Sequence, residues 1–295
     1  VVGAALIAGG PYGCAESLYA DAMPGPGTTF LNLSKAVNGC MLNALQAWGI
    51  PNPHQLADRA RYLASKGRLA PIESVHRHRV FLFTGREDHN VVPAIVRAAR
   101  DFYSELGIPE GQIELEDDLP AGHGFVTEDR GASCDRSASP YIVDCDFDLA
   151  GALLRHIYRN LMPKASSTPG DLITFDQHEF LADLSQHSMG TAGALYVPAQ
   201  CRTSPGCRVH IAFHGCGQNR DSVGEAFIRD TGFLPWAEAN RLIILFPQVE
   251  ATAANPQACW DWWGYTGRDF LTKEGPQIVA VRRMLDRLAA PRPMI

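Results

Sequence analysis

The sequence of 295 residues lacks the marks of several large protein classes. Its 26 basic residues are outnumbered by 32 acidic ones and form no stripe, so a nucleic-acid partner is not expected. The apolar run at residues 1–8 is too short to span a membrane, and no membrane span is predicted. This run also lacks the basic region and the small-residue cleavage site of a signal peptide, so it is predicted to be a buried strand.

Two short motifs are missing as well. Without a Cys-x-x-Cys pair or a second ligand near His214, neither a metal site nor a cofactor is expected. Gly-x-Ser-x-Gly, the turn between strand and helix that presents a nucleophilic serine in many hydrolases, does not occur. Ser65 and Ser188 lie in near misses of this motif. Ser65 falls in a helical pattern and no apolar strand precedes Ser188, so Ser188 is only a secondary candidate.

Cysteine is the first informative residue that is present. The chain has eight cysteines, an even number on loop-like segments, which favours disulfides and an oxidising compartment. The pairs Cys134–Cys145 and Cys201–Cys207 bracket turn-rich stretches that a short disulfide would close. The alternative is a cytosolic enzyme with free, buried cysteines. We therefore predict a secreted protein, with the periplasm as a possible site.

Strands and helices are predicted to alternate along the chain. Short apolar runs rich in β-branched and aromatic residues indicate strands at residues 1–8, 80–84, 194–197, 209–213 and 242–246. Helical spacing of apolar residues occurs at 92–106, 147–161 and 278–288. This alternation predicts an α/β fold with an open, mostly parallel sheet and helices on both faces. Residues 162–170 form the best internal linker, but each side has too few strands for a sheet, so residues 1–295 are predicted to be a single domain.

The first candidate catalytic residue is Asp88, on the loop that follows the strand at 80–84. Catalytic groups gather at the carboxyl ends of strands in α/β sheets, and hydrolases hold there the acid that orients a catalytic histidine. An isolated aspartate is more often a solvated turn residue. Asp88 is favoured because its loop is short and leads directly into a predicted helix.

The second candidate is His123. Among ten histidines it alone has glycine on both sides, in Gly122-His123-Gly124, which lets the chain turn and present the ring. It follows a predicted strand at residues 112–115. The order of acid, strand and histidine matches the second half of a Ser–Asp–His triad.

A third segment combines a predicted strand with a glycine-rich turn, His214-Gly215-Cys216-Gly217. A His-Gly-x-Gly turn after a buried strand is typical of the oxyanion loop of esterases, where a backbone N–H points at the developing alkoxide. The motif alone is only moderately specific.

Taken in order, these segments resemble the fungal-type extracellular polyhydroxybutyrate (PHB) depolymerases. The resemblance covers the chain to within about thirty residues of its end and implies a circularly permuted α/β-hydrolase fold. The matching stretches are Ala8-Gly9-Gly10-Pro11-Tyr12-Gly13-Cys14, Thr84-Gly85-Arg86-Glu87-Asp88, Gly122-His123, Ser139-Pro140-Tyr141-Ile142, Leu195-Tyr196-Val197-Pro198, Phe213-His214-Gly215-Cys216 and Cys259-Trp260-Asp261-Trp262.

The resemblance also implies roles for individual residues. Asp88 and His123 would be the triad acid and base, and Cys216 would supply a backbone N–H to the oxyanion hole. Trp262 would line the substrate crevice, which suits a polyester that is apolar between its esters. Trp260 and Trp263 are expected in the core instead. The expected partner is a polyester or a small ester.

Two further disulfides are expected at this end of the fold. Cys216 and Cys259 stand on loops that both belong at the active-site end, so we predict that they pair. Cys14 is then predicted to pair with Cys40.

The catalytic serine of the resembling family lies ahead of the strand that corresponds to residues 1–8. We therefore expect the nucleophile upstream of Val1. The leading function is a secreted serine esterase that cleaves poly(3-hydroxybutyrate) or its oligomers. The alternatives are another carboxylic-ester hydrolase, of the feruloyl or acetyl-xylan esterase type, and a non-catalytic polymer-binding relative.

Overall fold

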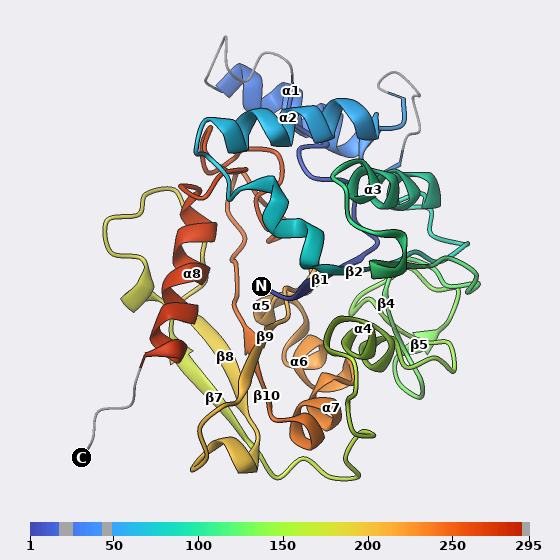
Figure 1. Cartoon of the computed structure of the whole chain (residues 1–295), viewed down its shortest axis with the longest axis vertical. Coiled ribbons are helices and arrows are strands. Elements are labelled where there is room, and N and C mark those ends of the chain that lie inside the picture. Colours follow the sequence, from blue (N-terminus) through green and yellow to red (C-terminus); the bar gives the residue numbers. More distant parts are fainter. Residues whose placement is uncertain (18–25, 43–48, 291–295) are drawn as a thin grey trace.

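The computed structural model describes residues 1–17, 26–42 and 49–290. In these ranges strands and helices alternate along most of the chain (Figure 1). The strands are β1 (Gly3–Ile7), β2 (Arg79–Phe83), β3 (Ile113–Glu116), β4 (Phe125–Thr127), β5 (Ala132–Ser133), β6 (Ile142–Asp144), β7 (Asp171–Asp176), β8 (Ala192–Val197), β9 (Arg208–Ile211) and β10 (Leu242–Phe246). The helices are α1 (Pro26–Gly39), α2 (Pro53–Ser65), α3 (Pro93–Glu105), α4 (Leu149–Tyr158), α5 (Arg220–Val223), α6 (Ala226–Asp230), α7 (Phe233–Asn240) and α8 (Pro276–Ala289), with short 3₁₀ turns at Ile72–Arg77, Glu110–Gln112, His178–Phe180 and Ala199–Cys201.

The strands form two main sheets. One has the order β1-β2-β3 and is entirely parallel. The other has the order β7-β8-β10-β9, in which only β9 and β10 are parallel, while β8 runs antiparallel to both β7 and β10. A small parallel sheet, β4-β6-β5, lies beside them. The predicted α/β fold with parallel strands is confirmed. The single open sheet that we expected is instead divided into two main sheets, and two of the three strand pairings in the larger one are antiparallel.

Helices cover both faces of the three-stranded sheet. Alternate residues of β2 point to opposite sides of the sheet. Phe81 and Phe83 pack into a core with α4, while Val80 and Leu82 pack with α3 on the other face. All four side chains are buried, which explains why this strand is a continuous apolar run in the sequence.

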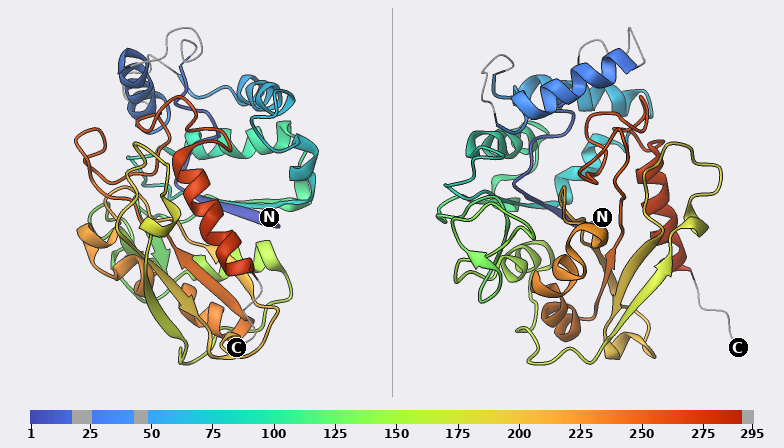
Figure 2. Two further views of the ribbon diagram at one scale, coloured as in Figure 1. Left: turned by 90° about the vertical axis from the view of Figure 1, so that its left-hand side faces the viewer. Right: turned by 180° about the vertical axis from the view of Figure 1, so that it is seen from behind.

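The four-stranded sheet is covered in the same way (Figure 2). Ile244 and Phe246 of β10 join the core that contains α4, α6 and α7, and Leu245 between them packs against α8. The core on the α4 side thus contains residues of both main sheets. The two sheets therefore share one hydrophobic layer.

The predicted helices are present with small shifts at their ends. Residues 92–106, 147–161 and 278–288 correspond to α3, α4 and α8. Helix α3 begins at Pro93, a residue favoured in the first turn because it has no N–H to leave unpaired. None of the helices in the described ranges is long and apolar enough to cross a bilayer.

Strand β1 departs from the sequence prediction of a buried strand. Most of its residues are only half-buried, and Val2 just before it is 56% exposed. The physical reason is its position, because β1 is the last strand of its sheet and its free edge borders a large cavity. Strand β9, the last strand of the other sheet, borders the same cavity.

Four disulfides join the eight cysteines, and none of the cysteines is free. Their pairs are those expected from the sequence, namely Cys14–Cys40, Cys134–Cys145, Cys201–Cys207 and Cys216–Cys259.

Candidate active site

Asp88 lies on the loop after β2 and its side chain is 1% exposed. One carboxylate oxygen, Oδ1, accepts hydrogen bonds from the backbone N–H groups of Asn90 (2.9 Å) and Val91 (2.8 Å). These two bonds hold the carboxylate just before α3 begins. A buried carboxylate needs such partners, since burying it without them costs several kcal/mol. The second oxygen, Oδ2, is left for His123.

The ring of His123 donates from Nδ1 to Oδ2 of Asp88 over 2.9 Å. A carboxylate only accepts, so this bond places the proton on Nδ1 and leaves Nε2 as an acceptor. Among the described residues, Asp88 is the only side chain bonded to this ring. His123 also lines the large cavity, and its side chain is 27% exposed. This is the arrangement of a general base that takes a proton at Nε2.

The loops that carry Asp88 and His123 are fastened to each other. The N–H groups of Arg86 and Glu87 donate to the carbonyl oxygens of Leu119 and Ala121. The contact is so close that a β-carbon at Gly85 would lie 2.0 Å from the Ala121 oxygen. Glycine at position 85 is therefore required for the acid and the base to meet.

The turn after β9 presents one free amide to the cavity. Within residues 215–218, the N–H of Gly215 donates to the side chain of Gln218, that of Gly217 to the carbonyl of Gln257, and that of Gln218 to the carbonyl of Gly215. The N–H of Cys216 has no hydrogen-bond partner among the described residues. Cys216 is exposed and lines the cavity together with His123. Its amide is thus the group in this turn that can bind an oxyanion.

His214 holds the start of the same turn in place. Its side chain is 3% exposed, Nδ1 donates to the carbonyl of Gly215 (2.8 Å), and Nε2 accepts from the N–H of Val249 (3.3 Å). Burial lowers the pKa of His214 to about 4, so the ring is neutral at neutral pH. A neutral ring with hydrogen bonds at both nitrogens indicates a structural role for His214.

The disulfide Cys216–Cys259 joins the turn to the segment that carries the tryptophans. Trp262 is half-buried and lines the cavity, as the sequence predicts for a crevice wall. Trp263 is 5% exposed and packs in a core cluster. Trp260 packs edge-on against Phe213 and beside His214. It therefore supports the turn of residues 214–217, which we call the candidate oxyanion turn, or oxyanion turn for short.

The cavity shared by these residues has a volume of about 960 Å³. This lies at the upper end of the range for small-molecule pockets, about 300–1,000 Å³. It extends from His123 and Trp262 to the facing edges of β1 and β9. Of the described serines, neither Ser65 nor Ser188 is among the residues that line it.

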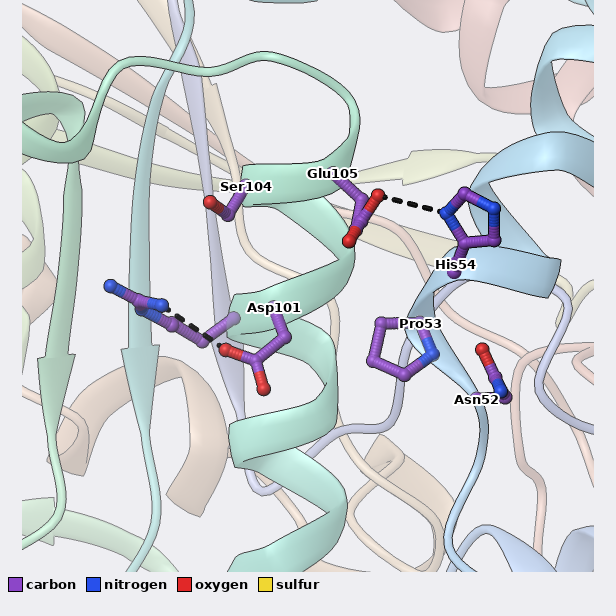
Figure 3. Close-up of a pocket in the computed structure, with 7 residues that line it drawn as sticks. Asn52, Pro53, His54, Asp101, Ser104 and Glu105 are labelled. Carbon is purple, nitrogen blue, oxygen red and sulfur yellow. Dashed lines mark hydrogen bonds and ion pairs between the residues drawn. The ribbon is translucent and has the colours of Figure 1, made fainter.

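A second, smaller pocket lies between α2 and α3 (Figure 3). Its volume is about 280 Å³, and none of the residues that line it also lines the large cavity. Its charged groups pair with each other, as His54 does with Glu105 (3.1 Å). His123, Cys216 and Trp262 therefore line the large cavity and not this pocket.

Two residues of the site were missed by sequence analysis. Tyr141 packs edge-on against His123 with ring centroids 6.1 Å apart, and Gln218 bonds the oxyanion turn to the backbone of Tyr141. The signal for Tyr141 was the Ser-Pro-Tyr-Ile stretch. Gln218 follows the glycine turn directly, but its partners lie 77 and 78 residues away.

Fold and site together define an α/β protein with an acid–base pair and a free backbone amide around one cavity. No protein-family model matches the chain. Among curated proteins it is 35% identical to a poly(3-hydroxybutyrate) depolymerase of Delftia acidovorans over 98% of this chain and 54% of that protein. It is 30% identical to a polyhydroxybutyrate depolymerase of Talaromyces funiculosus over 95% of this chain and 79% of that protein. The chain spans about half the length of the Delftia relative.

Solved structures give the same result. The PHB depolymerase from Penicillium funiculosum matches with a TM-score of 0.80 at 29% identity, over 96% of this chain and 86% of that one. A serine-to-alanine variant of PHB depolymerase, complexed with an R3HB trimer, matches with a TM-score of 0.81 at 29% identity, over 97% and 86%. The chain therefore belongs to the polyhydroxybutyrate depolymerase family.

Proposed function

We propose that this protein is a secreted serine esterase that hydrolyses ester bonds of poly(3-hydroxybutyrate) or its oligomers. The observation that carries the proposal is the hydrogen bond between Asp88 and His123 at a cavity that also contains the free amide of Cys216. Family membership adds the substrate class, because the relatives are named for the polymer. The four disulfides support a secreted protein.

Each residue has a defined task in this reaction. Nε2 of His123 accepts the proton of a serine hydroxyl as the serine attacks the ester carbonyl, and then protonates the leaving alkoxide. Asp88 keeps Nδ1 protonated and stabilises the imidazolium that forms. The Cys216 N–H donates to the oxyanion of the tetrahedral intermediate.

The nucleophile in this proposal is a serine on a segment upstream of Val1. Two observations support it. Strands β1 and β9 are the end strands of their sheets, and the free edges of both border the same cavity. A parallel strand inserted between them would satisfy both edges and merge the sheets into one. Its carboxyl end would then lie on the side of His123 and Cys216, which is where a nucleophile elbow belongs.

With that strand in place, residues 1–295 and the upstream segment would form one circularly permuted α/β-hydrolase domain. The common core supports a single domain, since Phe81 of one sheet and Ile244 of the other belong to the same buried cluster.

A polymer substrate is favoured by the apolar surface near the cavity. Trp262 lines the cavity, and Phe213 is 49% exposed beside it. Helix α1 is fastened to the adjoining loop by Asn32, whose amide donates to the carbonyl of Trp263 (2.9 Å).

Helix α1 differs from an ordinary surface helix in which of its side chains are buried. Its polar residues Thr28 and Asn32 are buried, whereas Phe30, Leu33 and Val37, spaced along one side, are exposed. Exposed apolar stripes of this kind mark contact surfaces. The surface of an insoluble polyester could contact this stripe while one of its chains enters the cavity. A small soluble ester bound in the cavity would not extend to the stripe.

The test is a granule-clearing assay. The full-length protein is incubated with a turbid suspension of poly(3-hydroxybutyrate) granules and, in parallel, with a panel of feruloyl, acetyl and butyryl aryl esters. We expect the turbidity to fall and 3-hydroxybutyrate oligomers to appear. Hydrolysis confined to the soluble esters would reject the polymer as substrate. Binding to granules without any hydrolysis would identify a polymer-binding relative instead.

A further inference from the structure

Gln218 forms hydrogen bonds both to the turn that carries Cys216 and to Tyr141, which packs against His123. Its side chain is 8% exposed. Oε1 accepts the N–H of Gly215 in the oxyanion turn (2.9 Å), and Nε2 donates to the carbonyl oxygens of Pro140 and Tyr141 (3.0 Å each). The orientation of the amide is fixed by these partners, because the reversed amide would place its NH₂ against an N–H and its oxygen against two carbonyls.

The oxyanion turn is built around this amide. A β-carbon at Gly215 would lie 2.8 Å from Oε1 of Gln218, so glycine is needed for the approach. Since Gln218 occupies the N–H of Gly215, and Gly217 and Gln218 donate to backbone carbonyls, the Cys216 N–H remains the free donor of the turn. The side chain of Gln218 therefore takes part in defining which amide faces the substrate.

The other end of Gln218 bonds to the support of the catalytic base. The Tyr141 carbonyl that accepts from Nε2 also accepts from the N–H of Phe125 (2.8 Å). The Tyr141 ring packs edge-on against His123, and the residue has a φ of +58°, which is uncommon for a side chain of this size. Such a conformation persists only where the surroundings hold it. The bonds from Phe125 and Gln218 supply that restraint.

We propose that Gln218 is a positioning residue that sets the distance between the oxyanion donor Cys216 and the base His123. The proposal rests on the esterase function proposed above. Gln218 lines the cavity, but its amide is bonded to Gly215, Pro140 and Tyr141, so it acts through these partners. Its effect arises because the base and the oxyanion donor come from different sheets, and a misplacement of about 1 Å at such a site can cost on the order of 10²-fold in rate.

The test uses two variants of the full-length protein. Gln218→Met keeps the side-chain volume and removes all three hydrogen bonds. Gln218→Glu keeps the shape and the acceptor for Gly215, but as a carboxylate it loses the donors to Pro140 and Tyr141 and faces their carbonyl oxygens, so it breaks the link to the base; it is assayed at about pH 8 or above to keep the carboxyl ionised. Kinetics are measured on a soluble butyryl aryl ester, and the melting temperature of each variant is recorded.

Gln177 provides the matched control. It is fully buried, its Nε2 donates to the carbonyls of Gly190 and Gln248, and its Oε1 accepts the N–H of Gln248, yet it does not line the cavity. Gln177→Met therefore removes three comparable bonds at a site that does not line the cavity.

We expect both Gln218 variants to lower kcat by roughly 10- to 100-fold with KM changed little, because the loss falls on transition-state binding. Gln177→Met should lower the melting temperature with kcat nearly unchanged. Wild-type kcat in a folded Gln218→Glu protein would overturn the proposal, as would equal losses of kcat in the Gln177 and Gln218 variants. A wild-type protein inactive on every ester would instead contradict the proposed esterase function.

Discussion

The proposed base, His123, and the proposed oxyanion donor, Cys216, follow strands of different sheets and are held in different ways. Asp88 and His123 follow strands of the parallel sheet, and hydrogen bonds position them: two backbone N–H groups bind the Asp88 carboxylate, which in turn binds the His123 ring. Cys216 follows β9 in the mixed sheet. Its turn is fixed by contacts with remote parts of the chain, the disulfide to Cys259 and the bond from Val249 to His214.

The difference predicts where each half is sensitive. The Asp88–His123 pair is held by hydrogen bonds, so single substitutions there should remove a chemical group with little change in the fold. The oxyanion side depends on cross-links, so its loss should show both in stability and in rate.

Substitutions of His123 or Asp88 should have the largest effect on kcat. His123→Ala removes the proton acceptor and should lower kcat on a soluble ester by roughly 10³-fold or more. Asp88→Asn should keep the fold but stabilise the wrong tautomer of His123, with a loss on the order of 10²- to 10⁴-fold. His214→Ala should lose less, since His214 acts through packing. Near-normal turnover by His123→Ala would end the assignment of the base.

Breaking the cross-link of the oxyanion side should cost both stability and rate. Replacing Cys216 and Cys259 together by serine should lower the free energy of unfolding by about 2–4 kcal/mol. It should also reduce kcat, because the turn that carries the Cys216 N–H is released.

The disulfide Cys201–Cys207 is the control for that experiment, since neither cysteine lines the cavity. Its removal should lower the melting temperature and leave kcat nearly unchanged. If both double variants lose kcat equally, the Cys216–Cys259 disulfide has no special role in the oxyanion turn.

Substitution of Trp262, which lines the cavity, should affect the rate on polymer and the rate on a small ester differently. Trp262→Ala should slow hydrolysis of polymer and long oligomers more than that of a small aryl ester, because only a chain uses the extended wall. Rates on both substrates are compared at one enzyme concentration. Equal losses on both, with a lowered melting temperature, would show that Trp262 is a packing residue.

The lowered pKa of His214 also predicts a pH dependence of stability. The folded-state pKa of His214 is about 4, below the value near 6.5 expected for an unfolded chain, so between these values the unfolded state binds more protons. The free energy of unfolding should therefore fall as the pH drops from about 6.5 to about 4. The groups around the ring are a carbonyl, an N–H and the rings of Phe227 and Trp260, none of them charged.

Melting curves between pH 4 and pH 8 check this prediction. His214→Gln keeps hydrogen-bonding groups but does not titrate, so it should lose less stability at acid pH than the wild type does. The same acid loss in both proteins would show that His214 does not contribute to it.

The sequence was informative where local chain chemistry determines the structure. Asp88 could be placed because it lies on a short loop after an apolar strand, and His123 because glycine stands on both sides of it; the structure brings the two within hydrogen-bond distance. The helix at α3 could be placed from its apolar spacing and from Pro93 at its start.

Features that depend on distant partners could not be predicted. The role of Gln218 depends on carbonyl groups more than 70 residues away. Strand β7 is mostly exposed, with no buried residue, and it is stabilised by its pairing with β8. The half-exposed state of β1 follows from the free edge beside β9, which no pattern within residues 1–8 reveals.

The central claim is that Asp88, His123 and Cys216 serve a serine presented between β1 and β9. The most direct measurement is labelling of the natural, active protein with a serine-directed fluorophosphonate, followed by peptide mass spectrometry. The account predicts one labelled serine, on a peptide N-terminal to Val1, with loss of labelling in His123→Ala. A label on Ser188, or full activity in a protein whose intact mass matches residues 1–295 alone, would contradict it.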